Sequence, residues 1–441
     1  MPAREGILLV NPYIHDFSAY NLWMRPLGLL GLYGFLAANG INVSYADALF
    51  PSGDEAEKYG LAWPESKKYH TGKFPETRIE KPLPYRNIQR HYRRFGIPPA
   101  VLRERFGNIP APECILMTSG MTYWYPGVQE TVRLCREAFP GVPVILGGVY
   151  ATLCASHARK HSGADMVLPG PWQKDLPEML RARFGIETRA AGRPRLELAP
   201  HEADLYPDSG FGTARLGEGC PFNCGYCASS LLSGGLLKYP VNLVYGGISR
   251  KVESGKRDIA FYDDALLSEA EDYLIPLLEL ISAGRIDCRF HTPNGLHARW
   301  MTGRIAGLFK ACDFRTVRLS FDRAGNGSSD EKATGAHLAA AARALEGAGY
   351  SRDEIEVYTL IGLNGQQDDD IIKAFRVIRD TGMKIAPAYY SPVPGTAFFE
   401  HDCRKAPELR DEPLLHNSSV AALWNYDYKR YDRLKMTAGS G

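Results

Sequence analysis

The sequence predicts an α/β protein in which a doubly wound parallel sheet precedes an incomplete (βα) barrel. Short apolar runs bounded by Gly and Pro alternate with helical stretches along nearly the whole chain. A polar, proline-containing segment at 191–210 interrupts this alternation and is expected to be a linker. With 441 residues the chain is also too long for one ordinary hydrophobic core, so two or three domains are expected.

The first half, residues 1–190, contains five steps of strand and helix. The expected strands lie at 6–12, 41–48, 113–120, 142–148 and 164–170, with helices at 25–40, 127–139 and 152–162. Because helical crossovers join parallel strands, this half is expected to form a doubly wound sheet of the Rossmann type. Gly147 and Gly148 end the fourth strand, where they suit either the close approach of a ligand or a plain tight turn.

A basic insertion at about 50–110 separates the second and third of these strands. Between 66 and 106 there are eleven Lys and Arg against three Asp and Glu, interleaved with aromatic residues. Such a stretch suits an acidic substrate or RNA, but it is more often a solvated insertion that wraps its own domain. The net charge of the whole chain, 52 minus 50 or +2, also argues against a nucleic-acid partner.

The second half, residues 211–396, repeats the strand–helix alternation six times. The expected strands lie at 212–219, 258–264, 287–293, 316–322, 354–362 and 384–392, with helices near 240–254, 268–284, 300–311, 335–348 and 367–381. Six such steps predict a partial (βα)6 barrel, with its chemistry at the carboxyl ends of the strands. The remainder, 397–441, is expected to be a helical tail.

Three cysteines, Cys220, Cys224 and Cys227, stand within eight positions after the first barrel strand. Closely spaced cysteines in a protein without a disulfide framework are usually metal ligands or redox groups. Zinc would need further ligands, for which His201, His291 and His297 are candidates. An iron–sulfur cubane fits better, because three thiolates would leave its fourth iron open to a ligand. An accidental grouping of cysteines is the remaining alternative.

The spacing C-x3-C-x2-C, with the aromatic Tyr226 before the last Cys, resembles the radical S-adenosylmethionine (radical SAM) enzymes. The resemblance covers about 210–396. It implies a [4Fe-4S] cluster on the three cysteines, with S-adenosylmethionine (SAM) chelating the open iron. It also implies that an electron from the cluster cleaves SAM to methionine and a 5′-deoxyadenosyl radical that abstracts hydrogen from the substrate.

Other residues at the ends of the barrel strands match this family more loosely. The Gly-Gly-Glu triplet common after the second strand is replaced here by "FYDDALL", and Asn364 stands in the fifth loop where Pro is common. For each position the alternative is an ordinary turn or loop residue that contacts no cofactor. The resemblance implies these candidate SAM contacts: Tyr226, Asp263, Asp264, Asn294, Ser320, Asp322, Gly362, Gly365 and Pro392.

The first half resembles the cobalamin-binding domain that precedes the barrel in one branch of this superfamily. The stretches "ILLVNP…RPLGLLGLYGFLAANG" and "FPGVPVILGGVYATL" carry the likeness, which implies candidate cobalamin contacts at Tyr13, His15, Gly147 and Gly148. Domains that place a His on cobalt use D-x-H-x-x-G after the first strand. Here the loop reads "NPYIHDFSAYN", with Asp16 after His15 and no spaced Gly. We therefore expect a surface or capping role for His15 and no His on cobalt.

The function expected from these features is a cytoplasmic radical SAM enzyme, most readily a cobalamin-dependent one that transfers methyl groups to unactivated carbon. Expected partners are a small-molecule or peptide substrate and an electron donor such as flavodoxin or ferredoxin. No membrane partner is expected, because no stretch reaches about 18 apolar residues and the amino-terminal apolar run is too short for a signal peptide. The alternatives are a cobalamin-independent radical SAM enzyme whose first domain docks substrate, and a non-catalytic corrinoid or metal-binding protein.

Overall fold

The computed structural model describes residues 5–188, 201–322, 333–420, 429–430, 433–434 and 436. The chain forms two compact units. Unit 1 comprises residues 1–210 and 411–415, and unit 2 comprises residues 211–410 and 416–441.

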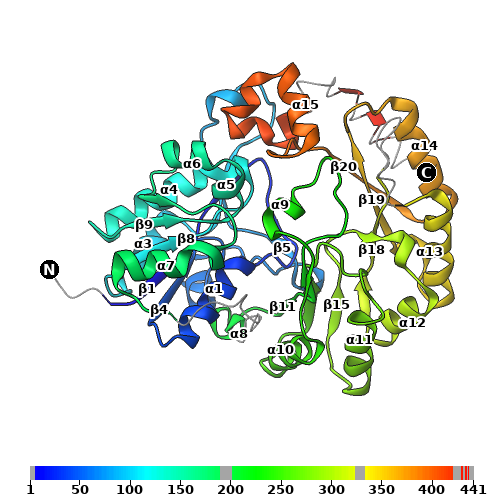
Figure 1. Ribbon diagram of the computed structural model, residues 1–441, viewed down its shortest axis with the longest axis horizontal. Helices are drawn as coiled ribbons and strands as arrows, with labels where there is room; N and C mark the ends of the chain where they lie inside the picture. Colours follow the sequence, from blue (N-terminus) through cyan, green and yellow to red (C-terminus); the bar gives the residue numbers. More distant parts are fainter. Residues whose placement is uncertain are drawn as a thin grey trace. The chain divides into compact units, whose positions relative to one another are not determined.

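Unit 1 is built on five parallel strands in the order β10-β9-β8-β1-β4 (Figure 1). The strands are β1 (Ile7–Asn11), β4 (Val43–Asp47), β8 (Cys114–Met117), β9 (Val144–Leu146) and β10 (Met166–Val167). The chain adds β4 on one side of β1 and then adds β8, β9 and β10 on the other side, so the strand order reverses between β1 and β8. In sheets of this kind ligands bind outside the carboxyl ends of the strands at such a reversal.

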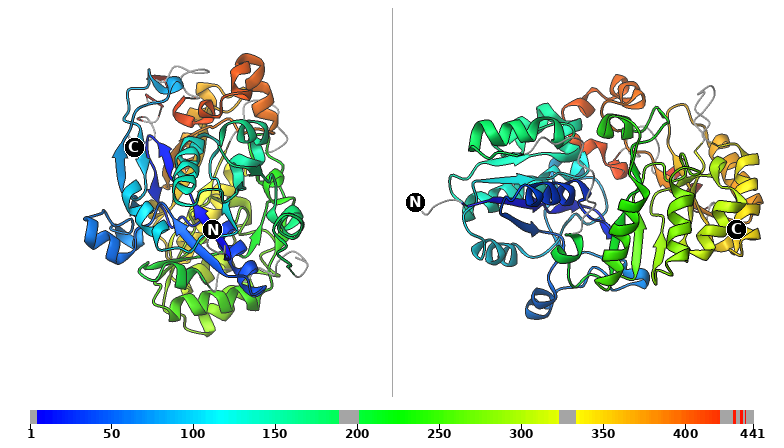
Figure 2. Two further views of the ribbon diagram at one scale, coloured as in Figure 1. Left: turned by 90° about the vertical axis from the view of Figure 1, so that its left-hand side faces the viewer. Right: turned by 60° about the horizontal axis from the view of Figure 1, so that its bottom comes forward.

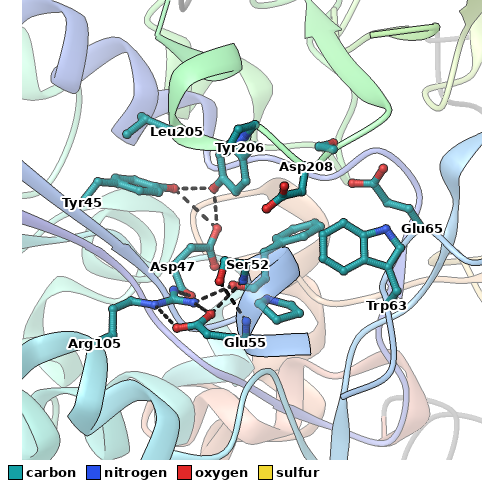
Figure 3. Close-up of a pocket in the computed structure, with 14 residues that line it drawn as sticks. Tyr45, Asp47, Ser52, Glu55, Trp63, Glu65, Arg105, Leu205, Tyr206 and Asp208 are labelled. Carbon is teal, nitrogen blue, oxygen red and sulfur yellow. Dashed lines mark hydrogen bonds and ion pairs between the residues drawn. The ribbon is translucent and has the colours of Figure 1, made fainter. Parts of the chain in front are cut away.

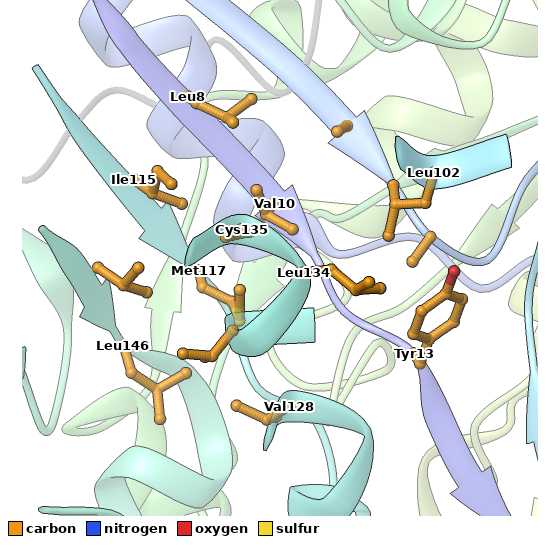
Figure 4. Close-up of a cluster of buried hydrophobic side chains, with 14 of the residues drawn as sticks. Leu8, Val10, Tyr13, Leu102, Ile115, Met117, Val128, Leu134, Cys135 and Leu146 are labelled. Carbon is orange, nitrogen blue, oxygen red and sulfur yellow. The ribbon is translucent and has the colours of Figure 1, made fainter. Parts of the chain in front are cut away.

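Helices cover both faces of this sheet (Figure 2). One face carries α1 (Leu27–Ala38) and α7 (Trp172–Phe184), and the other carries α3 (Pro99–Gly107), α4 (Tyr125–Ala138), α5 (Gly148–Leu153) and α6 (Ala155–His161). Both faces of β1 are buried: Leu8 and Val10 pack with the second group of helices (Figure 4), while Ile7 and Leu9 pack with the first. A strand buried on both faces needs a continuous apolar run, which is what its sequence provides.

The basic segment at 50–110 folds onto the rest of unit 1. It contains α2 (Gly53–Tyr59), η1 (Lys68–His70), β5 (Gly72–Lys73), β6 (Glu76–Arg78), η2 (Leu83–Tyr85), β7 (Arg93–Phe95) and α3. Strand β7 pairs with β2 (Ile14–Asp16) and with β6, and β5 pairs with β3 (Tyr20–Asn21). Since α3 also contributes to the core beside β1, the segment wraps its own domain as expected.

Unit 2 is a series of parallel strands in the chain order of a partial barrel, in two sheets, β11-β14-β15-β17 and β16-β18-β19-β20. The strands are β11 (Phe211–Ala214), β14 (Asp258–Phe261), β15 (Arg289–His291), β16 (Leu296–His297), β17 (Phe314–Thr316), β18 (Arg318–Ser320), β19 (Glu356–Ile361) and β20 (Lys384–Tyr389). The helices between them are α10 (Val241–Glu253), α11 (Leu274–Ala283), α12 (Gly303–Ala311), α13 (Gly335–Gly347) and α14 (Asp368–Asp380).

The third and fourth barrel strands are each interrupted. The third consists of β15 and β16, and the fourth of β17 and β18. Pro293 lies in the first gap and has no backbone N–H to give to the ladder. The Thr292 side chain takes over part of the pairing: its hydroxyl donates to the Thr316 carbonyl (3.0 Å) and accepts from the Arg318 N–H (3.2 Å).

Short elements complete the two units. Unit 1 has η3 (Thr122–Trp124) and α8 (Glu202–Leu205), and unit 2 has β12 (Gly217–Glu218), α9 (Ser229–Ser233), β13 (Leu237–Lys238), η4 (Ala298–Trp300), η5 (Arg352–Glu354), α15 (Ala397–Lys405) and η6 (Pro407–Arg410). The turn η7 spans Pro413–His416, and most of the expected tail beyond 420 lies outside the described residues. Within the described ranges, no helix has the length and hydropathy needed to cross a bilayer.

Candidate cluster and cofactor site

The three clustered cysteines lie on a loop between β11 and α9, at the carboxyl end of the first barrel strand. Cys224 is buried, whereas Cys220 and Cys227 are partly exposed. The Cys227 N–H donates to the Cys224 carbonyl (3.0 Å), which turns the chain between the two thiols. All nine cysteines belong to the described residues, and none forms a disulfide. The thiols of the loop are therefore not held in disulfides.

Two carboxylates from the end of β14 hold this loop. Asp263 accepts the Leu216 N–H with both oxygens (3.0 Å each), and Asp264 accepts the Gly219 N–H (3.1 Å). Burial raises the pKa of Asp263 to about 6, opposed by the Leu216 hydrogen bonds and by Lys238. The Asn294 amide in turn donates to the Asp263 carbonyl (3.1 Å). Three candidate SAM contacts thus support the cysteine loop directly or through one neighbour, and their contact with SAM stays a prediction.

A third carboxylate holds the loop from the other side of the cysteines. The Tyr226 hydroxyl donates to one oxygen of Asp322 (2.9 Å), and the Leu360 N–H donates to the other (2.9 Å). Burial, then the neighbouring Asp322 charge, raises the pKa of Tyr226 far above its usual value, so the phenol stays a donor. Asp322 therefore joins the cysteine loop to the fifth barrel strand. Ser320, two residues earlier, donates its hydroxyl to the Leu296 carbonyl (3.3 Å).

The loop after β19 is closed by a glutamine. The Gln366 side-chain oxygen accepts the N–H groups of Gly362 (2.8 Å) and Leu363 (3.2 Å), and its amide donates to the Leu360 carbonyl (3.1 Å). Gly365 lies in the same loop and is exposed. The sequence analysis did not identify Gln366, because a buried glutamine that bonds its own loop has no distinctive spacing.

The start of α15 lies against the cysteine loop. The Phe398 N–H donates to the Gly225 carbonyl (2.9 Å), and its ring centroid is 6.0 Å from that of Tyr226. The Asn364 amide donates to the Phe398 carbonyl (3.0 Å), which ties the loop after β19 to the same helix. Pro392 is buried in the connection that leads from β20 to this helix. The barrel-end loops thus form one connected network around the cysteines.

The donor set fits an iron–sulfur cluster better than a single ion. No three His, Cys, Asp or Glu side chains in the described part of the chain gather closely enough to hold one metal ion. In a cubane each thiolate binds a different iron, so the thiols need not converge on one point. Both ring nitrogens of His291 have protein partners, Asp258 (2.8 Å) and Thr316 (3.1 Å), which removes this residue from the zinc alternative.

One basic residue near the cysteines was missed by the sequence analysis. Lys238, on β13, is partly buried and its pKa is lowered by desolvation, an effect that Asp263, Glu269 and Cys220 oppose. Its strand pairs with Gly217 and Glu218, which lead into the cysteine loop. The residue stands in the unremarkable stretch "LLKYP", so only the fold reveals that a cation lies beside the expected cluster ligands.

The edge of the unit 1 sheet contains Gly147 and Gly148. Gly148 has φ +91°, and a Cβ there would stand 2.4 Å from the Ser119 carbonyl oxygen, so packing within the protein requires glycine. Among the described residues, a Cβ on Gly147 would meet one atom within 4 Å, the Leu168 carbonyl oxygen at 3.9 Å. The protein's own packing leaves that space open. The carboxyl end of β9 therefore suits the close approach of a ligand such as a corrin ring, and cobalamin contact there stays a prediction.

The other two candidate cobalamin residues are engaged within unit 1. His15 is only 8% exposed, on β2, and its Nε2 lies 2.7 Å from Glu130 Oε2. The expected surface or capping role is therefore wrong: pairing of β2 with β7 buries the ring. Tyr13 is 1% exposed and belongs to the hydrophobic core (Figure 4), and burial raises its pKa.

No protein-family model matches the sequence, and no curated protein matches it. Solved structures do match. The radical SAM methyltransferase TsrM from Kitasatospora setae, with cobalamin and a [4Fe-4S] cluster bound, has a TM-score of 0.64 and 13% identity over 91% of this chain and 78% of TsrM. The structure of TsrM with its tryptophan substrate and the SAM analogue aza-SAM has a TM-score of 0.64 and 15% identity. This match covers 91% of this chain and 76% of TsrM.

A second enzyme, OxsB, a cobalamin-dependent SAM radical enzyme with aqua-cobalamin bound, gives a TM-score of 0.55 and 11% identity. The match covers 98% of this chain and 61% of OxsB. The chain has the fold of the cobalamin-dependent radical SAM enzymes. The predicted fold class, a Rossmann-like domain followed by a partial radical SAM barrel, is confirmed.

Proposed function

We propose that the chain is a radical SAM enzyme that reductively cleaves SAM at a [4Fe-4S] cluster and uses cobalamin, for example to methylate an unactivated carbon. The observation that carries the proposal is the cysteine loop. Three thiols that form no disulfide lie at the carboxyl end of a parallel barrel strand, and carboxylates hold their loop on both sides, Asp263 and Asp264 before the cysteines and Asp322 behind. A cubane with three protein thiolates retains one iron for a small ligand.

In this proposal Cys220, Cys224 and Cys227 hold the cluster, which when bound supplies the electron that cleaves SAM. Other residues of the chain fix the backbone of the cysteine loop. Asp263 and Asp264 fix the backbone before Cys220, and Tyr226 and Asp322 fix it between Cys224 and Cys227. Catalytic groups act efficiently when such supporting hydrogen bonds hold them in place. Candidate SAM contacts remain Tyr226, Asn294, Ser320, Gly362, Gly365 and Pro392, together with Asp263, Asp264 and Asp322.

For cobalamin we propose the carboxyl edge of the unit 1 sheet near Gly147. Support comes from the reversal of strand order between β1 and β8 and from the space beside Gly147. Since Nε2 of His15 already contacts Glu130, we propose that no histidine of this loop binds cobalt. TsrM and OxsB, which share the fold, were solved with cobalamin bound.

We further propose a small-molecule or peptide substrate and a small electron donor such as flavodoxin or ferredoxin. A cytoplasmic location suits nine cysteines without a disulfide and a cluster that needs reducing conditions.

The test is anaerobic reconstitution with iron, sulfide and hydroxocobalamin, followed by reduction and addition of SAM. Release of methionine with 5′-deoxyadenosine, or of S-adenosylhomocysteine with methylcobalamin, supports an enzyme. SAM turnover without cobalamin binding would favour the cobalamin-independent alternative. Cobalamin binding without any SAM turnover would favour a non-catalytic corrinoid carrier. A Cys220→Ala variant is the control, because it should retain cobalamin binding and lose SAM turnover.

A further inference from the structure

Unit 1 contains a cavity of about 260 Å³ that Gly147 and Gly148 do not line. It lies beyond the carboxyl end of β4, between the 50–65 segment and the residues that follow α8, and is called here the acidic pocket (Figure 3). Its lining residues are Tyr45, Asp47, Phe50, Pro51, Ser52, Glu55, Trp63, Glu65, Arg105, Leu205, Tyr206, Pro207, Asp208 and Ser209.

One side of the acidic pocket is a network of polar groups that bind one another. Asp47 accepts hydrogen bonds from the Asn11 amide (2.9 Å), the Leu49 N–H (2.7 Å) and the Tyr206 hydroxyl. Arg105 forms an ion pair with Glu55 and donates to the carbonyls of Asp47 and Phe50. These groups shape the wall, and their hydrogen-bonding capacity is largely used within the protein.

The opposite side holds carboxylates with unused capacity. Glu65 is 6% exposed, and its Oε2 accepts the Gly210 N–H (2.7 Å). Its Oε1 has no hydrogen-bond donor among the described residues, but it forms a 3.7 Å ion pair with Nη2 of the buried Arg25. Asp208 is exposed and accepts the Gly53 N–H (2.8 Å). The exposed carboxylate of Asp208 can accept further hydrogen bonds, so it can bind a ligand that brings a donor.

Aromatic surface lies next to these carboxylates. Figure 3 shows the carboxylate groups of Glu65 and Asp208 on the side of the pocket where the Trp63 ring lies. Four lining side chains are acidic and one is an arginine, and Arg25 pairs with Glu65 from behind the wall, so the formal charge is 2 minus 4, or −2. A desolvated negative site beside an indole face favours a cation, because the ring quadrupole and the carboxylates attract the same charge.

We propose that the acidic pocket binds a small organic cation, an ammonium or guanidinium group on a flat apolar body. The cationic group would donate to Asp208, in the field of the Glu65 carboxylate, and the apolar body would lie against Trp63. The volume is near the lower end of the range for small-molecule sites, which limits the ligand to roughly the size of an amino acid. A bare metal ion fits less well, since no three acidic, His or Cys groups of the described chain converge on one point.

The test is isothermal titration calorimetry of the full-length chain with tyramine and with tyrosol, which has a hydroxyl group in place of the amine. The expected result is one site per chain that binds tyramine at least tenfold more tightly than tyrosol. Asp208→Asn and Glu65→Gln should each weaken tyramine binding at least tenfold. Both amides keep the oxygen that accepts a backbone N–H, so the fold is preserved. Glu57→Gln, an exposed acid on α2 outside the pocket, is the matched control and should bind as the parent does.

Equal affinity for tyramine and tyrosol, or no binding of either at millimolar concentration, would overturn the proposal. Tyramine binding that survives in both Asp208→Asn and Glu65→Gln would also overturn it, because the cation would then bind elsewhere. Titration of the same variants with hydroxocobalamin separates this proposal from the proposed function. Cobalamin affinity should be unchanged, and a chain that binds tyramine selectively but no cobalamin would contradict only the proposed function.

Discussion

The hydroxyl of Tyr226 donates a 2.9 Å hydrogen bond to the carboxylate of Asp322. Tyr226 directly precedes the last cysteine of the C-x3-C-x2-C loop, and Asp322 follows the fourth barrel strand. The second oxygen of the same carboxylate accepts the Leu360 N–H of β19. The geometry of the expected cluster ligands therefore depends on a carboxylate that lies 96 residues from Tyr226 in the sequence.

Replacing Tyr226 by Phe should destabilise the cysteine loop, but the loop should still bind the cluster. The change removes a donor from a carboxylate, and hydrogen bonds to charged groups contribute about 1.5–3 kcal/mol. We expect the free energy of unfolding to fall by about that amount, and the electron paramagnetic resonance (EPR) signal of the reduced cluster to broaden. Tyr358→Phe, a partly exposed tyrosine on β19, is the control. An unchanged stability and signal in Tyr226→Phe would show that the hydrogen bond does not fix the loop.

Replacing Cys220, Cys224 and Cys227 together by Ala should abolish iron binding and the absorption near 400 nm. Far-ultraviolet circular dichroism should change little, because the three residues lie on a loop and not in a strand or helix. Cys154→Ala, which removes another partly exposed thiol, should keep its full iron content. A triple variant with undiminished iron would mean that other side chains bind the metal.

Sequence patterns sufficed for the strand–helix order of the two units and for the place of the three cysteines after the first barrel strand. Buried parallel strands need short apolar runs and helices need longer periodic ones, and both can be read locally. The hydrogen-bond partners of the site residues could not be predicted from local sequence patterns. His15 meets Glu130 across 115 positions, and Asp263 meets Leu216 across 47, because the fold and not the local sequence brings them together. The acidic pocket combines residues 45–65 with 205–209 and has no sequence signature for the same reason.

Any cobalamin bound to the chain should show no nitrogen of His15 on cobalt. In the structure Nε2 of His15 lies 2.7 Å from Glu130, which also pairs with Arg94 (3.0 Å). We expect the EPR spectrum of the cob(II)alamin form to contain no nitrogen superhyperfine splitting that depends on His15. His15→Ala should lower the thermal midpoint, since it removes a buried partner of Glu130, and leave this spectrum unchanged. Splitting that is present in the parent and lost in His15→Ala would place this histidine on the metal.

Unit 2 should lose stability in acid through His416. This ring is buried and its Nε2 donates to the Leu409 carbonyl (2.8 Å); burial lowers its pKa to about 4. Below the ordinary pKa of about 6.5 the unfolded chain takes up a proton that the folded chain does not, so stability falls as the pH drops from about 6.5 to 4. The full loss in free energy of unfolding is about 3 kcal/mol, because a shift of one pKa unit corresponds to about 1.36 kcal/mol.

His416→Gln keeps a donor for the Leu409 carbonyl and cannot titrate. Its thermal midpoint should therefore decline less steeply between pH 7 and 4.5 than that of the parent. His401→Gln, at a partly exposed position on α15, should follow the parent. Parallel pH profiles for the parent and His416→Gln would contradict the assignment of this acid sensitivity to His416.

The central claim is that three thiolates leave one iron of a [4Fe-4S] cluster open for SAM. The most direct measurement is the EPR spectrum of the reconstituted, dithionite-reduced protein before and after SAM is added. We predict a reduced cluster signal whose g values shift when SAM binds, with neither signal in the variant that lacks all three cysteines. A cluster signal that SAM leaves unchanged at saturating concentration would show a closed, four-ligand site and contradict the account.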